Sequence, residues 1–260
     1  MNATSLPAAR AGMTPARVLG AYLAEARSEC LRYLRNPAFM LPLMLFPAVF
    51  YVMFGVLMNK DQNPHVASYL LASYGAFGIM GPGLFGFGAS LAIERGGGLL
   101  MLKRALPMPP GAYLLGKMAM AMVITGLMML LMLALGVFAG GVTLTAWQIL
   151  ALLACGILGV LPFCALGMLV GTLIKGQGAP GLLNLVYLPM AFLSGLWFPL
   201  SMMPRVLGSI APIWPSYHLN LIMQRAIGLS EGPWLLHAAI LAAFGAVFFI
   251  LAVRRLRRHG

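Results

Sequence analysis

Charged residues are scarce in this chain, and acidic residues are the scarcest. Only 8% of its 260 residues are Asp, Glu, Lys or Arg, and only five are acidic. Soluble proteins carry about 25% charged residues. Here 61% of the residues are hydrophobic and the mean hydropathy is +0.92. These values exclude an ordinary soluble domain and predict an all-α membrane protein with one membrane domain.

Patterns for catalysis or metal binding are missing as well. The hydrophobic runs hold no paired carboxylates for acid–base chemistry, and the four histidines lack metal-ligand spacing. Cys30, Cys155 and Cys164 form neither a metal motif nor a disulfide framework. Because ion-coupled and proton-coupled transport need ionisable groups within the membrane, their scarcity argues against both. We therefore expect no metal site and no cofactor in this chain, and an energy source outside it.

Bases outnumber acids by 17 to 5, which gives a net charge of +12. No basic patch is interleaved with aromatic residues, so nucleic acid is not an expected partner. The bases lie in short loops and at the termini instead, which is the pattern of a protein oriented in a lipid bilayer.

Six hydrophobic runs, each near the ~20 residues that a bilayer requires, predict six transmembrane helices. They cover about 39–58, 69–93, 118–138, 149–174, 182–198 and 234–253. A helix from Thr14 to Arg35 is expected before them, because Thr is a good cap and Pro15 suits the first helical position. Its apolar residues at helical spacing predict an amphipathic helix at the membrane surface. We therefore divide the chain into a tail with an interfacial helix (1–37) and a six-span domain (38–260).

The distribution of bases predicts the orientation. With six spans both termini share a side, and that side receives 14 of the 17 bases. The positive-inside rule then places both termini in the cytoplasm. Between the fifth and sixth runs, Pro199, Pro204, Pro212 and Pro215 stand among aromatic residues, which predicts an outer re-entrant helical hairpin buried against protein.

The longest charged interruption is the stretch 94–117, ERGGGLLMLKRALPMPPGAYLLGK. Three glycines allow a sharp turn and the prolines end any helix before them, so a short amphipathic helix is expected on the cytoplasmic side. Its end, Gly111 to Lys117, has the G-x-x-x-x-G-K spacing of a phosphate-binding loop. Met118 stands where that loop needs Ser or Thr, and a hydrophobic run follows directly. We interpret Lys117 as an anchor at the membrane surface.

Three blocks of the sequence together resemble the ABC-2-type permeases of bacterial ABC exporters. They are the entry helix leading into LRNPAFMLPLMLFPAVFYVMFG, the charged stretch above, and FLSGLWFPLSMMPRVLGSIAPIWPSYH before the last run. The second is similar to the family's E-R-x-x-G-x-L-x-x-L-x-x-x-P segment, and the third to its S-G-x-x-F-P-x-x-x-x-P block. GGG stands where many members have one glycine and a polar residue.

The resemblance implies a function and partners. Two such permeases, identical or paired with a close sibling, form the path through the bacterial inner membrane, and two cytosolic ATPase subunits bind the ATP and Mg and drive export. The residues implied to couple to the ATPase are Glu94, Arg95, Gly98, Leu99, Leu102, Lys103 and Arg104. Asn184 and Ser194 are candidates for lining the path, and Pro199, Pro204 and Trp214 for the outer gate.

The sequence leaves open the cargo and the functional class of the protein. Few charges in the runs favour an amphipathic, drug-like or lipid-like cargo, and a glycan is the alternative. A lipid-modifying membrane enzyme with Ser216 and His218 at the outer surface is a rival interpretation. A subunit that assists assembly and transports nothing is another.

Overall fold

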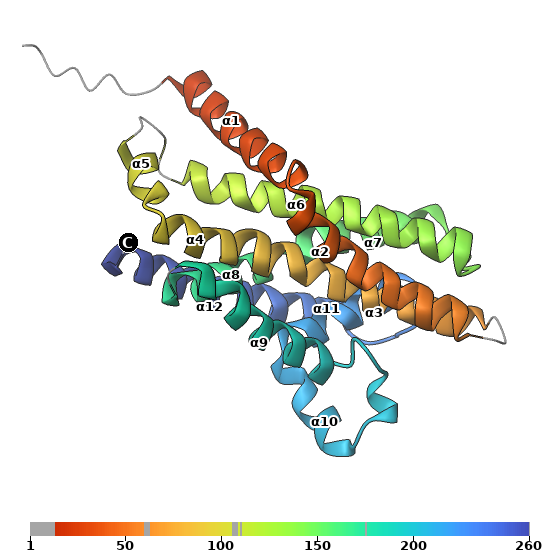
Figure 1. The fold of residues 1–260 in the computed structure, drawn as a ribbon. Helices are drawn as coiled ribbons and strands as arrows, with labels where there is room; N and C mark the ends of the chain where they lie inside the picture. Colours follow the sequence, from red (N-terminus) through yellow and green to blue (C-terminus); the bar gives the residue numbers. More distant parts are fainter. Residues whose placement is uncertain (1–13, 60–62, 106–108, 110, 175, 260) are drawn as a thin grey trace, which may run out of the picture.

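The computed structural model describes residues 14–59, 63–105, 109, 111–174 and 176–259, and within these ranges the regular structure is helical throughout. The helices form an elongated bundle (Figure 1). The all-α expectation is confirmed. The predicted contribution of Lys60 and Lys175 to the orientation falls outside the described residues.

The central helix is one continuous rod from Pro64 to Gly96, made of α3 (Pro64–Gly81), the π-helical turn η2 (Pro82–Ala89) and α4 (Ser90–Gly96). At 1.5 Å per residue its 33 residues span about 50 Å. The Asn63 side chain caps its start by accepting a hydrogen bond from the His65 N–H. Pro82 has no N–H to donate, and the helix widens at this residue. From Leu70 to Ala89 every residue of this rod is buried, so this part forms the core of the bundle.

The remaining membrane helices pack against this rod, the last of them through its neighbours rather than directly. They are α2 (Pro37–Phe50) with η1 (Tyr51–Leu57), α6 (Ala112–Ala134) with η3 (Leu135–Ala139), α7 (Ala146–Gly159) followed by α8 (Leu161–Leu173), and α12 (Trp234–His259). Glycines make the contact between η2 and α8 very close. A Cβ on Gly88 would lie 2.6 Å from the Gly167 carbonyl oxygen, and one on Gly171 would lie 2.6 Å from the Gly88 oxygen. The glycine-rich second run is therefore used for packing inside the subunit.

In the part of the chain that the structure describes, five helices are long and apolar enough to cross a membrane, which leaves the six-span count a prediction. The predicted fifth span, 182–198, corresponds to α9 (Ala179–Leu193), a helix of only 15 residues. It ends at Ser194, and Gly195 turns the chain with a φ of 74° that favours glycine. At about 22 Å, α9 is shorter than the hydrocarbon core of a bilayer.

The proline-rich stretch after α9 folds into short helices, and an outer re-entrant hairpin stays a prediction. The short helices are η5 (Leu200–Met202), α10 (Arg205–Ile210), η6 (Ala211–Ile213) and α11 (Pro215–Ala226). Helix α11 packs back against α3, α7 and α12, so its polar side chains are buried against protein.

Helix α1 (Pro15–Leu34) is flanked by Thr14 and Arg35 and packs along α6, but the Thr14 side chain makes no capping hydrogen bond. Figure 1 shows α1, α5 (Leu99–Ala105) and the C-terminal end of α12 at one end of the bundle. That α1 lies at the membrane surface stays a prediction. Glu29 is buried, whereas Leu19 and Leu23 are more than 60% exposed.

Candidate functional site

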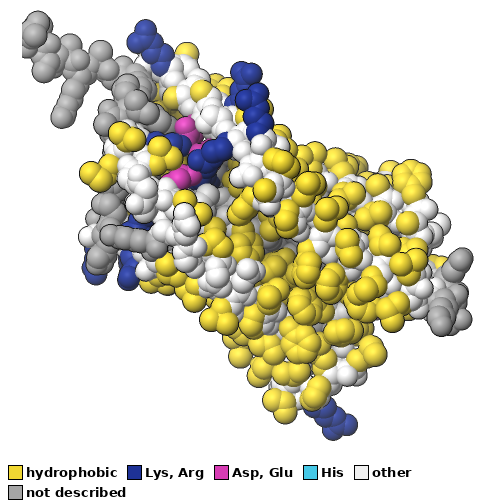
Figure 2. Space-filling view, viewed as in Figure 1, with side chains coloured by type: hydrophobic (Ala, Val, Ile, Leu, Met, Phe, Trp, Pro, Cys, Tyr) yellow, Lys and Arg dark blue, Asp and Glu magenta, His cyan; other side chains and the backbone are white. Residues whose placement is uncertain are grey.

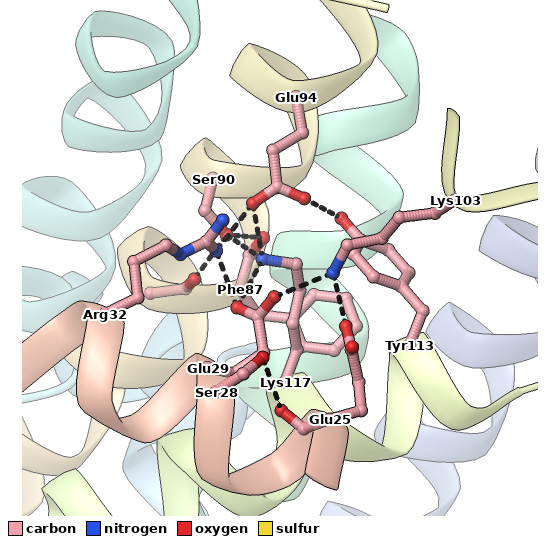
Figure 3. Close-up of polar contacts among 11 residues, drawn as sticks. Glu25, Ser28, Glu29, Arg32, Phe87, Ser90, Glu94, Lys103, Tyr113 and Lys117 are labelled. Carbon is pink, nitrogen blue, oxygen red and sulfur yellow. Dashed lines mark hydrogen bonds and ion pairs between the residues drawn. The ribbon is translucent and has the colours of Figure 1, made fainter. Parts of the chain in front are cut away.

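A compact cluster of six charged side chains joins four helices at the end of the bundle that holds α1 and α5 (Figure 3). Three carboxylates face three cations, so the cluster is neutral overall. Its members are Glu25, Glu29 and Arg32 of α1, Glu94 of α4, Lys103 of α5 and Lys117 of α6. Three of the chain's five acidic residues are used here. In Figure 2 this end carries most of the visible charged side chains, while most of the remaining visible face is hydrophobic.

Lys117 lies at the centre of the cluster and is completely buried. Its Nζ atom donates to Glu94 Oε1 at 2.9 Å, to Glu29 Oε2 at 3.1 Å and to Ser90 Oγ at 2.8 Å. These three contacts use all three donors of the ammonium group. The interpretation of Lys117 as a surface anchor is therefore wrong, because acidic residues from α1 and α4 make burial of its charge affordable.

Glu94 connects α4 to two neighbouring helices. Besides Lys117, its Oε1 atom contacts the Arg32 guanidinium of α1 at 2.6 Å. Its Oε2 atom accepts a hydrogen bond from the Tyr113 hydroxyl at 2.5 Å. Glu94 thus ties the end of α4 to α1 and α6.

Lys103 is the link between α5 and α1. Its Nζ atom pairs with Glu25 and lies 3.1 Å from Glu29 Oε1. Burial lowers the pKa of Lys103, but the hydrogen bond that Lys103 donates to Glu25 and the charge of Glu29 outweigh this effect, so the pKa is raised above its ordinary value. Glu25 and Glu29 stand four residues apart on one helix face, where like charges repel. A cation between them removes that repulsion and pins α5 onto α1.

The outer surface of α5 is apolar and open. Met101 is 75% exposed and Leu102 is 66% exposed. The segment turns sharply before this helix at Gly98, whose φ is 76°, and Arg95 holds the turn by donating to the Gly171 carbonyl of α8 at 3.1 Å. Leu99 begins the helix. The side chain of Arg104 lies outside the described residues.

The two residues expected to line a path lie on different sides of α9. Asn184 is exposed, between the exposed Leu182 and Leu185. Ser194 is buried, and its Oγ atom lies 2.5 Å from Ser216 Oγ and donates to the Met190 carbonyl. The structure therefore does not bring Asn184 and Ser194 together.

The expected gate residues flank the short helices after α9. Pro199 precedes η5 and Pro204 precedes α10. Trp214 precedes α11 and packs against the core.

Ser216 and His218 make separate contacts. Residues two apart on a helix do not face each other. The His218 ring lies with Nε2 2.9 Å from the Pro212 carbonyl and Nδ1 2.9 Å from His237 Nδ1, while Ser216 contacts Ser194 and the Met190 carbonyl. A serine nucleophile with this histidine as its base is not the arrangement that we observe.

Sequence reasoning singled out Glu94 and Lys103 but missed Glu25, Glu29 and Arg32 as their partners. The sequence did contain a signal for these partners. Two carboxylates four residues apart in a chain with five acids are costly at an apolar surface unless bases meet them. Bases that can meet them stand within the same helix and in the stretch 94–117 already singled out.

Comparisons with known proteins agree with the membrane fold. A family model described as "ABC-2 family transporter protein" matches residues 47–254. The chain is 30% identical over 231 residues to a protein named "Putative transport permease YvfS" from Bacillus subtilis (strain 168), and the match covers 88% of this chain and 94% of that relative. Helix α1, with its three members of the charge cluster, precedes the residues that the family model matches.

Proposed function

Because the chain belongs to the ABC-2 family of transporter proteins, we propose that it is the transmembrane permease subunit of an ATP-binding-cassette exporter. The family establishes a multi-pass membrane permease, and it implies an ABC ATPase as partner. The proposal goes further: two ATPase subunits on separate chains bind ATP and Mg, and two permeases, identical or close siblings, form the path. The cargo leaves the cytoplasm and is amphipathic, drug-like or lipid-like, with a glycan as the alternative.

The observation that carries this proposal is α5, a short helix with exposed Met101 and Leu102 next to the buried charge cluster. Large apolar side chains exposed at the charged end of a membrane protein are suited to contact with a soluble partner. A force on α5 reaches α1 through Lys103, and it reaches α4 and α6 through Glu29 and Lys117. Because these contacts are buried ion pairs, movement that breaks them is costly, and the four helices move together.

The orientation in the bacterial inner membrane is part of the proposal. Arg254, Arg255 and Arg258 are exposed at the end of α12, which lies at the same end of the bundle as α1 and α5. Bases concentrated at one end favour that end being cytoplasmic. Both termini and α5 then face the cytoplasm, where the ATPase binds.

The test is recovery of the ATPase with the tagged permease in mild detergent. Met101→Glu with Leu102→Glu places two charges on the apolar surface of α5 and is expected to reduce ATPase recovery at least tenfold. Met202→Glu is the matched control, since Met202 is 76% exposed but belongs to η5. Equal ATPase recovery with all variants would contradict docking at α5. An absence of any ATPase with the folded native protein would contradict the proposed function itself.

A further inference from the structure

Aromatic rings form a continuous array between α2, α3 and α9, away from the charge cluster. Each ring has a neighbour at a centroid separation of 4.6 to 6.4 Å. The array contains Phe46, Phe50 and Phe54 of α2 and η1, Tyr74 and Phe77 of α3, Phe85 of η2, Tyr187 and Phe192 of α9, and Trp197 and Phe198 after it.

The array has a fixed base and an open edge. Tyr74 and Phe77 are fully buried. The Tyr74 hydroxyl donates to the Trp197 carbonyl at 3.2 Å, and the Tyr187 hydroxyl donates to the Phe77 carbonyl at 3.2 Å, so both rings are held in place. The open edge is Phe46, Phe192 and Phe198, which are 40%, 38% and 42% exposed. These three residues come from three separate segments, yet they border the same group of rings.

The chemistry of this surface is aromatic rather than ionic. Among the described residues, the ion pairs all lie in the charge cluster at the other end of the molecule. The Trp197 indole N–H is a buried donor without an acceptor, and a donor left in that state costs free energy.

We propose that this open aromatic edge binds a planar aromatic cargo, neutral or carrying one positive charge. Ring pairs gain free energy beyond burial alone when they are offset or edge-to-face, and ring faces attract cations. A saturated acyl chain gains neither contribution, so the array favours flat rings over lipid tails. This inference rests on the proposed function, since it names the class of cargo that the permease carries. Asn184, on the exposed side of the same α9, offers an amide for a polar substituent.

The test measures binding of rhodamine 6G, a planar aromatic cation, to the purified chain in nanodiscs by fluorescence polarisation. Phe46→Leu and Phe192→Leu keep an apolar side chain but remove the ring, and each is expected to weaken binding about 2- to 10-fold, as for the loss of one ring contact. Phe192→Tyr keeps the ring and should bind as the native protein does. Phe249→Leu is the matched control, because Phe249 is 39% exposed on α12 and outside the array.

The outcomes separate this inference from the proposed function. Affinities unchanged by Phe46→Leu and Phe192→Leu, or weakened equally by Phe249→Leu, would overturn it even where an ATPase co-purifies. Displacement of rhodamine 6G by a saturated twelve-carbon detergent as effectively as by ethidium would also overturn it and assign the surface to lipid. If a second copy of the chain covers the open edge instead, cysteines placed at position 192 will cross-link and no rhodamine 6G will bind. That result would also overturn the inference. Ring-dependent binding without any ATPase would support the inference and contradict the proposed function.

Discussion

Lys117 is the residue on which the charge cluster depends most, because both carboxylates that it contacts are themselves buried. Lys117→Met removes the cation and leaves Glu29 and Glu94 with less compensation. Breaking a buried pair in this way costs about 3–5 kcal/mol of the free energy of unfolding. Thermal unfolding in detergent measures the loss, and Arg255→Met, at an exposed position, serves as the control.

A double variant separates the free energy of the ion pair from that of burying a long side chain. Lys117→Met combined with Glu94→Gln removes charge from both partners, so it should cost less than the sum of the two single changes. Additive effects would show that Lys117 is not energetically coupled to Glu94.

His218 makes the stability of the protein depend on pH. Burial lowers its pKa, the Pro212 carbonyl raises it, and His237 lowers it, with a net decrease below the ordinary value. The folded state therefore favours the neutral ring, whereas the unfolded chain takes up a proton near pH 6.5. Stability from this residue is fully present above pH 6.5 and is lost as the pH falls through that value. Since Nε2 must donate to the Pro212 carbonyl, Nδ1 of neutral His218 accepts from His237.

The expected result is a larger fall in melting temperature between pH 7.5 and pH 5.5 for the native protein than for His218→Gln. His65→Gln, at an exposed position on α3, should behave as the native protein does. A His218→Gln variant with the native pH profile would refute the assignment.

At the scale of elements, η2 and α8 lie so close at Gly88 and Gly167 that neither position has room for a side chain. Gly88→Ala places a methyl group 2.6 Å from the Gly167 oxygen, and because that atom is backbone, no side-chain movement relieves the clash. We expect a loss of about 1–3 kcal/mol or more, as for overpacking, seen as a lower melting temperature and lower yield of membrane protein. Gly126→Ala is the control, since its methyl group would meet only Ile157 at 3.7 Å. A melting temperature equal to that of Gly126→Ala would show that the two helices can separate at low cost.

The hydrophobic runs predicted the long helices well, because burial in a bilayer depends on length and composition, which the sequence displays directly. They predicted α9 less well. Phe192 and Trp197 continue the apolar run in the sequence, but Gly195 turns the chain between them, and a composition window does not register one left-handed residue. The buried polar face of α11 was also missed, since Asn220 finds its partner, Ser73, 147 residues away.

Part of the candidate site was predictable because the sequence shows directly which charges interrupt an apolar run. Glu94 and Lys103 stood out as charges between two apolar runs. Their pairing with Glu29 depends on α1 packing along α6, a long-range contact that periodicity within α1 does not specify. Hydrophobic spacing would have favoured burying Leu23, which is 63% exposed, rather than Glu29.

At the scale of the whole molecule, α1 joins the proposed ATPase surface to the membrane helices. Glu25→Gln with Glu29→Gln removes both negative charges that pair with Lys103 while leaving Met101 and Leu102 in place. We expect the ATPase to co-purify as before, but transport per ATP hydrolysed to fall at least several-fold, because α5 is no longer pinned to α1. Transport into inverted vesicles and ATP hydrolysis measured on one preparation give this ratio. An unchanged ratio would show that α1 has no part in transmitting the motion.

The order in which the chain is synthesised gives the charge cluster another consequence. Glu29 leaves the ribosome 88 residues before Lys117, an interval of roughly 4–18 s at ordinary translation speeds of 5–20 residues per second. During that time the α1 carboxylates have no Lys117 to meet and stay hydrated, which holds α1 outside the hydrocarbon layer. The cluster closes only when the hairpin of the second and third membrane helices has entered the bilayer in the correct direction. A nascent chain that inserts the hairpin wrongly keeps its acidic helix exposed, and quality-control proteases can distinguish it from a correctly assembled one.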